Sequence, residues 1–188
     1  WFNNLGFLHV YTTKLYAQLL LYIIGLTISA VALYFTYRAT WRTSWGPTVL
    51  PLTSFATEWI KRSLIVGAAV LGFTIVLSFA SALADRWESF LRFWNSTSFG
   101  IADPQFGNDV GFYVFTLPML HVIQGWLLGL SVVILVTTTG FYLLIYSARG
   151  ISPVINDHTK RHLAIVGSGL MVTIAAGHFL DTYETLFS

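Results

Sequence analysis

The chain has 188 residues, of which 55% are hydrophobic and only 10% are charged, and its formal net charge is +2. Because soluble domains carry about a quarter of their residues as charged side chains, this composition predicts a membrane protein. The small, dispersed charge argues against a nucleic-acid partner, and the lack of cysteine excludes disulfides, thiolate metal sites and cysteine nucleophiles.

Four apolar stretches are each long enough to cross a bilayer, which takes about 20 residues of helix. None of them contains Asp, Glu, Lys or Arg. The predicted spans are residues 15–37, 63–84, 117–146 and 162–180. No repeat or linker separates them, so we expect an all-α fold, a polytopic helical bundle forming one transmembrane domain over residues 1–188. The ends of the sequence indicate a piece of a longer protein.

The distribution of Lys and Arg predicts how the spans are oriented. The connections 38–62 and 147–161 hold seven of the ten basic residues. The positive-inside rule therefore places both connections in the cytoplasm, and the N-terminus, the connection 85–116 and the C-terminus outside. The expected host is a bacterial inner or plasma membrane, or a thylakoid membrane if the source is photosynthetic.

The connection 85–116 begins with an amphipathic pattern over residues 85–95. Its apolar residues Trp87, Phe90, Leu91 and Trp94 follow the spacing i, i+3, i+4, i+7, with charged residues between them. We expect a short helix lying in the membrane interface.

Residues 103–118, DPQFGNDVGFYVFTLP, combine turn signals with an aromatic run. Asp103, Asn108 and Asp109 raise the question of a Ca²⁺ loop, but the alternating acids and terminal Glu of an EF-hand are missing. We expect these side chains to order turns instead. Thr116 is predicted to cap the third span, with Pro118 in its first turn.

The fourth span is entered through a polar segment in which Asn156 or Asp157 can cap the helix. His158 and His162 are spaced i, i+4, which can place two imidazoles on one face for Zn²⁺. No third ligand beyond Asp157 is evident, and the neighbouring Lys160–Arg161 pair opposes a cation. A basic interfacial anchor is the favoured interpretation, and the sequence predicts no metal site.

His121 and His178 are the two ionisable residues that can face the membrane interior, and an antiparallel arrangement of spans three and four puts them at similar depth. They are candidate axial ligands of chlorophyll or haem, or of a shared metal. The alternative is a pair of interfacial histidines that bond to backbone or loop, because polar residues near the interface are inexpensive.

Small residues recur at four-residue spacing in spans three and four and predict close helix packing, with contacts within the chain favoured. These residues are Gly125 and Gly129 in the third span, and Gly169, Thr173 and Gly177 in the fourth.

The stretch DPQFGNDVGFYVFTLP resembles the pattern D-P-x-F-G-x-D-x-x-F-Y-x-F-x-L-P of uncharacterised protein family 0182, which comprises large bacterial membrane proteins. The matching residues are Asp103, Pro104, Phe106, Gly107, Asp109, Phe112, Tyr113, Phe115, Leu117 and Pro118. The Arg-His-Leu at 161–163 and the Leu-Asp-x-Tyr-Glu at 180–184 are also similar to the family. The resemblance implies about seven spans followed by a large extracytoplasmic domain, with spans two to five supplied by this chain. The family has no assigned activity, so the resemblance implies no catalytic residues.

The sequence lacks the enzyme motifs that were sought. It has no His-Glu-x-x-His and no Gly-rich phosphate loop, and VGSGL around Ser168 lacks the Gly that a G-x-S-G protease motif needs. We therefore expect no catalytic site. The favoured function is a structural or accessory subunit, or membrane anchor, whose partners are lipids and other membrane subunits. The alternatives are a part of a transporter or channel, and a pigment- or haem-binding subunit of a photosynthetic complex. The sequence leaves the cofactor unknown.

Overall fold

The computed structural model describes residues 8–44, 54–149 and 156–185. Within these segments the chain is helical apart from short connections, so the all-α prediction is confirmed. The elements are α1 (Leu8–Ser44), α2 (Ser54–Ala84), α3 (Trp87–Trp94), the π-helical turn η1 (Phe112–Thr116), α4 (Leu117–Ala148) and α5 (Asp157–Glu184). Helices α1, α2, α4 and α5 are each long and apolar enough to cross a membrane.

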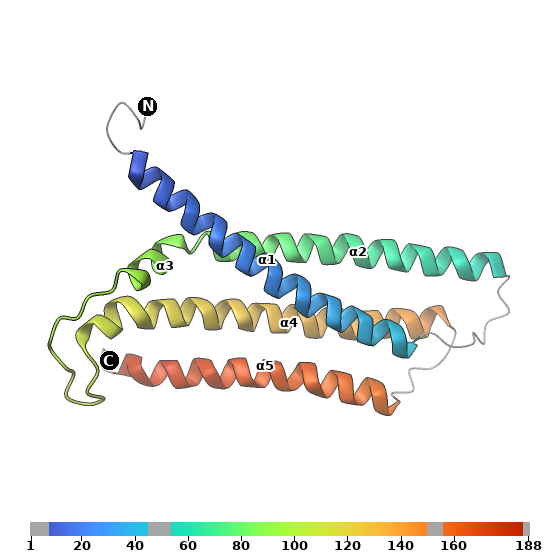
Figure 1. Ribbon diagram of the computed structural model, residues 1–188. Coiled ribbons are helices and arrows are strands. Elements are labelled where there is room, and N and C mark those ends of the chain that lie inside the picture. The colour runs from blue at the N-terminus through green and yellow to red at the C-terminus, as the bar shows by residue number, and fades with distance from the viewer. Residues whose placement is uncertain (1–7, 45–53, 150–155, 186–188) are drawn as a thin grey trace.

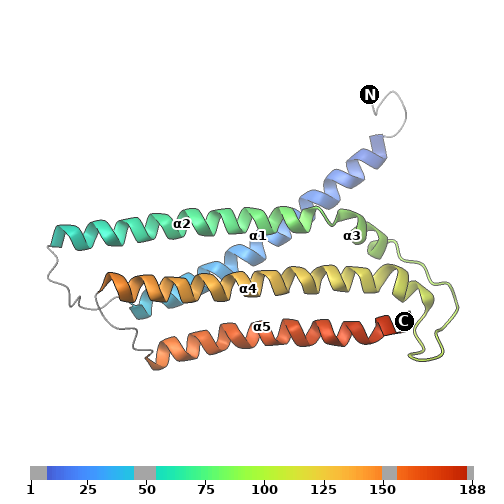
Figure 2. The ribbon, with the colours of Figure 1, turned by 180° about the vertical axis from the view of Figure 1, so that it is seen from behind.

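Helices α2, α4 and α5 lie side by side in one layer with α4 in the middle, and α1 crosses one face of that layer obliquely (Figures 1 and 2). The four long helices run up and down. The last residues of α2 and α5 therefore lie at the same end as the first residues of α1 and α4. We call this end, which also carries α3 and residues 95–116, the motif end, and the other the basic end.

The helices are longer than the charge-free spans predicted from sequence. Helix α1 begins at Leu8 instead of residue 15 and ends at Ser44 instead of residue 37. The hydropathy criterion finds only the apolar middle of each helix, whereas the backbone hydrogen bonding continues through polar flanks such as Lys14 and Arg38. The predicted helix at 85–95 is α3, with bounds Trp87–Trp94.

One predicted helix cap is correct and one is wrong. The Asn156 side chain accepts a hydrogen bond from the Thr159 backbone N–H at 2.8 Å and caps α5. Thr116 does not cap α4, because its backbone is already helical and its side chain makes no cap bond. Thr116 is the last residue of the π-helical turn η1, which continues directly into α4. The helical backbone therefore starts upstream of Thr116. Pro118 does lie in the first turn of α4.

Helices α1 and α2 cross at a line of small and apolar residues that the sequence did not single out. Ala17, Leu21, Gly25 and Ser29 are buried at four-residue spacing along α1. A Cβ added at Gly25 would lie 3.1 Å from the Ala80 Cα. The absence of a side chain at Gly25 thus lets the two backbones approach, as small residues do in membrane bundles.

Two polar side chains of α4 bond to the backbone of a neighbouring helix. The Trp126 indole N–H donates to the Phe79 carbonyl at 2.9 Å and joins α4 to α2. The Gln124 amide donates to the Thr173 carbonyl at 2.9 Å and joins α4 to α5.

Some of the small residues that were predicted to pack lie at helix contacts in the structure, and others do not have a neighbouring atom close by. Gln124 lies over Gly177, where an added Cβ would meet its Nε2 at 2.6 Å, and Gly129 faces the Phe79 ring. These positions and Thr173 are at helix contacts. At Gly125 and Gly169 no atom lies within 4 Å of an added Cβ, so packing there stays a prediction.

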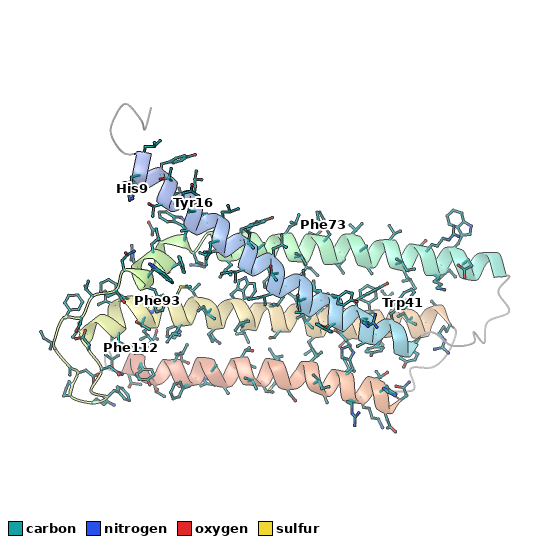
Figure 3. The ribbon with its side chains drawn as sticks, viewed as in Figure 1. His9, Tyr16, Trp41, Phe73, Phe93 and Phe112 are labelled. Carbon is teal, nitrogen blue, oxygen red and sulfur yellow. The ribbon has the colours of Figure 1, made fainter. Side chains whose placement is uncertain are left out.

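Large apolar side chains cover the outside of the long helices. Tyr16 of α1 and Phe73 of α2, labelled in Figure 3, have exposed fractions of 72% and 65%. Such side chains are unfavourable in water over so large an area. The outer surface therefore fits a membrane location.

Candidate functional site

The connection between α3 and α4 is organised by two aspartates of the sequence motif. The Asp103 carboxylate accepts hydrogen bonds from the backbone N–H groups of Gln105, Phe106 and Asn108, at 2.6–2.9 Å. It also accepts one from the Tyr113 hydroxyl at 2.7 Å. Asp103 thus closes the turn 103–108 and attaches it to the π-helical turn.

Asp109 performs the same task for the preceding segment. Its carboxylate accepts from the Ser98 hydroxyl at 2.7 Å and from the backbone N–H groups of Phe99, Gly100 and Gly111. The segments on either side of the turn are thereby fixed to one another. The expected role of these aspartates in ordering turns is confirmed, because their oxygens are directed to loop donors.

The backbone of the connection explains two of its glycines. Gly100 and Gly107 adopt φ of +69° and +70°, a conformation that other residues rarely adopt. Gly111 is needed for space instead, since an added Cβ would lie 2.5 Å from the Thr97 carbonyl oxygen. Between these points Ala102 and Asp109 form an antiparallel bridge.

The hydrogen bonds shift the acidity of both carboxyls. The Ser98 hydroxyl, together with the N–H groups of Phe99, Gly111 and Gly100, lowers the pKa of Asp109 to about 2. Desolvation alone would raise the pKa of Asp103, but the bonds from Phe106, Tyr113, Asn108 and Gln105 outweigh it and lower the pKa. Both groups are therefore carboxylates at neutral pH, which is the form that accepts these hydrogen bonds.

The connection docks on the last turn of α5 through aromatic rings. Tyr183 packs against Phe106 and Phe112, with ring centroids 5.0 Å and 5.4 Å apart. Phe112 lies where the loop approaches α4 and the end of α5 (Figure 3). Phe99 stacks on Phe115 at 6.0 Å. Two stretches about 75 residues apart in sequence, 103–118 and 180–184, therefore meet at the motif end.

A histidine and two acids converge beside this contact. His121 Nε2 of α4 lies 3.2 Å from Glu184 Oε1 of α5. Asp181 joins them, and one ligating atom from each of the three side chains lies within 4.8 Å of the others. The His121 side chain is 28% exposed, against 58% for Glu184. His121 also lines a recess of about 450 Å³ that is bordered by Arg86.

The two histidines of the sequence prediction occupy neighbouring helices at the motif end, and each has a carboxylate partner on α5. His178 is 80% exposed and its Nδ1 lies 3.6 Å from Asp181 Oδ2. Asp181 thus stands next to both histidines, whereas His178 is outside the three-residue cluster found in the described part of the chain. Their role as axial ligands stays a prediction.

The histidines at the start of α5 differ from one another. His158 is exposed, while His162 Nδ1 lies 2.9 Å from the Tyr142 hydroxyl of α4. That bond gives His162 a partner across the helix pair. The proposed basic anchor at this end stays a prediction.

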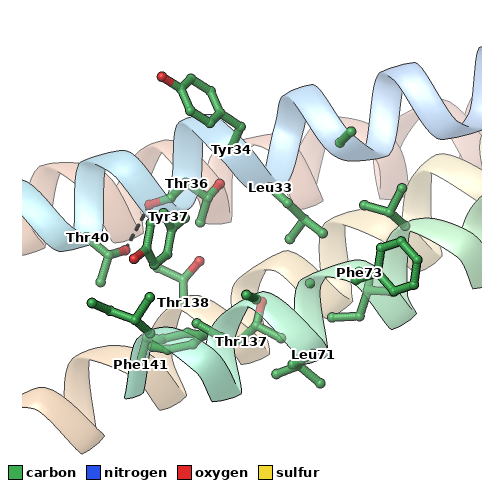
Figure 4. Close-up of a pocket in the computed structure, with 17 residues that line it drawn as sticks. Leu33, Tyr34, Thr36, Tyr37, Thr40, Leu71, Phe73, Thr137, Thr138 and Phe141 are labelled. Carbon is green, nitrogen blue, oxygen red and sulfur yellow. Dashed lines mark hydrogen bonds between the residues drawn. The ribbon is translucent and has the colours of Figure 1, made fainter. Parts of the chain in front are cut away.

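A second hollow lies between α1, α2 and α4. Its volume is about 410 Å³, and Figure 4 shows it lined by apolar side chains such as Leu33, Leu71 and Phe141. The hydroxyls of Thr40, Thr137 and Thr138 each donate to a carbonyl of their own helix. The hollow thus offers an apolar surface suited to an acyl chain or another helix.

The model of the uncharacterised protein family UPF0182 matches residues 1–188. The chain belongs to this family.

Its relatives are much longer than the chain. A UPF0182 protein of Kineococcus radiotolerans is 35% identical over 99% of this chain and 19% of its own length. A UPF0182 protein of Cupriavidus necator is 32% identical over 100% of the chain and 21% of its length. One from Microcystis aeruginosa is 35% identical over 69% and 14%. The chain thus spans about a fifth of these relatives at most, and no solved structure matches it.

The motif residues of this UPF0182 chain lie together in the structure, but several of their partners escaped sequence reasoning. Ser98 and Gly100 bond to Asp109 from outside the motif, and nothing in their spacing marks them. Tyr183 belongs to the Leu-Asp-x-Tyr-Glu stretch at 180–184, which resembles the family. Its contact with Phe106 could not be predicted, because the two residues are far apart in sequence. Gln124 carried the clearest missed signal, as an amide within an apolar span.

Proposed function

We propose that this segment is a membrane anchor and scaffold within the longer protein, and that it holds an ordered platform at the motif end. The observation that carries the proposal is the connection 95–116. It receives eight hydrogen bonds at the two carboxylates Asp103 and Asp109 and docks on Tyr183. A loop fixed this firmly suits a surface on which another part of the assembly rests.

The orientation proposed for the platform is extracytoplasmic, in a bacterial plasma or thylakoid membrane. Arg38 of α1, Lys61 of α2 and Arg149, which directly follows α4, all belong to the basic end. The positive-inside rule assigns that end to the cytoplasm. Residues 45–53, 150–155 and both chain ends lie outside the described segments, so the orientation rests on the helices.

A structural role is also supported by how the polar groups are used. The carboxylates of Asp103 and Asp109 accept hydrogen bonds from donors of the connection, and the Gln124 and Trp126 side chains join helices. We propose no catalytic role for this segment. Its partners would be lipids and other membrane subunits, or other helices of the same protein, along the exposed apolar faces.

The orientation is tested with two single-cysteine variants, Gln105→Cys and Lys160→Cys, in full-length protein without other cysteines. A membrane-impermeant maleimide on intact cells should label residue 105 and should label residue 160 only after permeabilisation. The reverse pattern would overturn the orientation.

The scaffold role is tested by purifying the full-length protein after gentle solubilisation and measuring the mass and composition of the complex. We expect a membrane protein in fixed stoichiometry, released by the variant Asp103→Asn/Asp109→Asn while insertion persists. The variant Asp85→Asn is the matched control, because it changes a carboxylate outside the platform. A protein that purifies only with itself and drives ion flux in vesicles would contradict the proposal and favour transport.

A further inference from the structure

We propose that His121, Asp181 and Glu184 form a binding site for a divalent transition metal of the Zn²⁺ type. The three side chains come from two helices, α4 and α5, and converge at the motif end. The site does not depend on the scaffold role, since it would be present whether or not a partner rests on the platform.

The donor set selects the class of ion. Imidazole nitrogen suits Zn²⁺ and its neighbours, whereas Ca²⁺ and Mg²⁺ prefer sites made of oxygen only. Imidazole nitrogen and Asp or Glu oxygen are both zinc ligands, and three protein ligands leave a fourth position for water. The site should therefore bind Zn²⁺ in preference to Ca²⁺.

The distances are close to what a metal requires. Donors placed about 2.0–2.2 Å from a tetrahedral zinc lie roughly 3.3–3.6 Å from one another. His121 Nε2 and Glu184 Oε1 are 3.2 Å apart, which is close to the separation of two ligands of one zinc ion. The remaining separations are at most 4.8 Å. Asp181 has an exposed side chain, and binding requires that side chain to turn towards the other two donors.

A second observation concerns His121 alone. Its Nε2 atom is shielded from solvent and makes no hydrogen bond, even though the Glu184 oxygen is near. A simple hydrogen-bonded pair would align an N–H with that oxygen. A buried ring nitrogen without such a bond, facing two carboxylates, is what a metal ligand presents before the ion is added.

The charges around the site favour a bound cation. Within the described residues neither Asp181 nor Glu184 forms an ion pair with Lys or Arg, and the His178 Nδ1 lies 3.6 Å from Asp181 Oδ2. Arg86 borders the recess on which His121 lies. Two acids this close to one another repel, and a bound dication would offset that repulsion.

The site is coupled to the platform by its position. Asp181 and Glu184 flank Tyr183, whose ring packs on Phe106 and Phe112. His121 follows the π-helical turn by about one helical turn. A bound metal would therefore fix the end of α5 against α4 directly beneath the connection.

The test uses the purified full-length protein after treatment with a chelator. Zn²⁺ binding is measured by equilibrium dialysis and metal analysis in the wild type and in Glu184→Gln, Asp181→Asn and His121→Gln. His158→Gln is the matched control, since it removes an exposed histidine at the other end of α5. We expect each ligand variant to lose one equivalent of Zn²⁺, with affinity reduced by at least about 100-fold, because outer-shell changes already cost about 10–100-fold. The control should keep that equivalent.

A measurement on the wild type alone guards against variants that fold poorly. Hydrogen-exchange mass spectrometry follows the backbone amides of α5 with and without the ion. Zn²⁺ should slow exchange in residues 180–184 and leave residues 157–162 unchanged, and Ca²⁺ at the same concentration should slow neither. Equal zinc content in wild type and Glu184→Gln, or equal exchange of residues 180–184 with and without Zn²⁺, would overturn the site.

Discussion

The connection 95–116 and the four long helices are held together in different ways. In the connection, two carboxylates accept eight hydrogen bonds, six from backbone N–H groups and two from the hydroxyls of Ser98 and Tyr113. Between the long helices, the side chains of Gln124 and Trp126 bond to a neighbouring backbone, and the Tyr142 and Tyr146 hydroxyls bond to His162 and Thr159. The long helices also rely on close approach at small residues such as Gly25 and on apolar surface.

This difference explains where sequence-specific information lies. An apolar span tolerates many exchanges among Leu, Ile, Val and Phe, because hydrocarbon does not distinguish them strongly. The connection needs an acid at 103, an acid at 109 and a residue tolerant of positive φ at 107. A long motif can therefore identify a family when the spans around it cannot.

The largest expected effect comes from removing one of the two carboxylates. Asp109→Ala leaves the N–H groups of Phe99, Gly100 and Gly111 without their acceptor. We expect amide exchange in residues 98–111 to become about 10–100-fold faster, since loss of these bonds permits local opening. Hydrogen-exchange mass spectrometry measures it. Asp85→Ala, a change to an exposed carboxylate at the end of α2, should leave this segment unchanged. Equal protection in both variants would show that the aromatic contacts alone hold the connection.

The next effect concerns the packing of the helices. Gly25→Leu should push α1 away from α2, because even a Cβ would lie 3.1 Å from the Ala80 Cα. Overpacking of this kind costs about 1–3 kcal/mol. Unfolding by a denaturing detergent reports the free-energy change. Gly67→Leu is the matched control on α2, where no atom lies within 4 Å of an added Cβ. Similar losses for both substitutions would contradict a close crossing at Gly25.

Acidification should weaken the connection without unfolding the helices. The pKa of Asp109 is lowered to about 2 in the folded protein, against about 3.9 for an unperturbed Asp. A lowered folded-state pKa stabilises the fold fully above pH about 4, and that stabilisation is lost as the pH falls towards about 2. Protonation of Asp103, whose pKa is also lowered, acts in the same direction.

The change is followed by fluorescence anisotropy of a dye on Gln105→Cys, in full-length protein without other cysteines. We expect the anisotropy to drop between pH about 4 and about 2, with little change in helical circular dichroism. The same label on Asp103→Asn/Asp109→Asn should give a low, flat profile. A wild-type transition well above pH 4 would point to a different titrating group.

The comparison also shows which features could be predicted from sequence. The four spans followed from apolar runs, the α5 cap from Asn156, and the helix α3 from its period. Each depends on residues near one another in the chain. The cap assigned to Thr116 was wrong, because the π-helical turn before α4 extends the helix and no local pattern marks such a turn.

The rest of the site depends on contacts between distant residues. The approach of Tyr183 to Phe106, and of Glu184 to His121, follows from how far α5 extends past its apolar stretch beside α4. The hydropathy criterion ended that span at residue 180, so the residues that complete the cluster fell outside it. The line of small residues through Gly25 had a readable spacing, and only its partner Ala80 required the structure.

The smallest expected effect comes from substituting Gln124, whose side-chain amide joins α4 to the backbone of α5. Gln124→Leu removes the 2.9 Å bond to the Thr173 carbonyl, an oxygen that also lies within a helical backbone. Hydrogen bonds between membrane helices average about 0.6 kcal/mol and reach about 1.7, so detergent unfolding should show a loss in this range. Gln18→Leu, a change to a glutamine of α1, is the control and should cost less. If Gln124→Leu proves neutral, the contact between α4 and α5 rests on the close fit at Gly177 and on the tyrosine hydroxyls that bond to His162 and Thr159. The specific bonds of the structure would then be concentrated still more strongly in the connection.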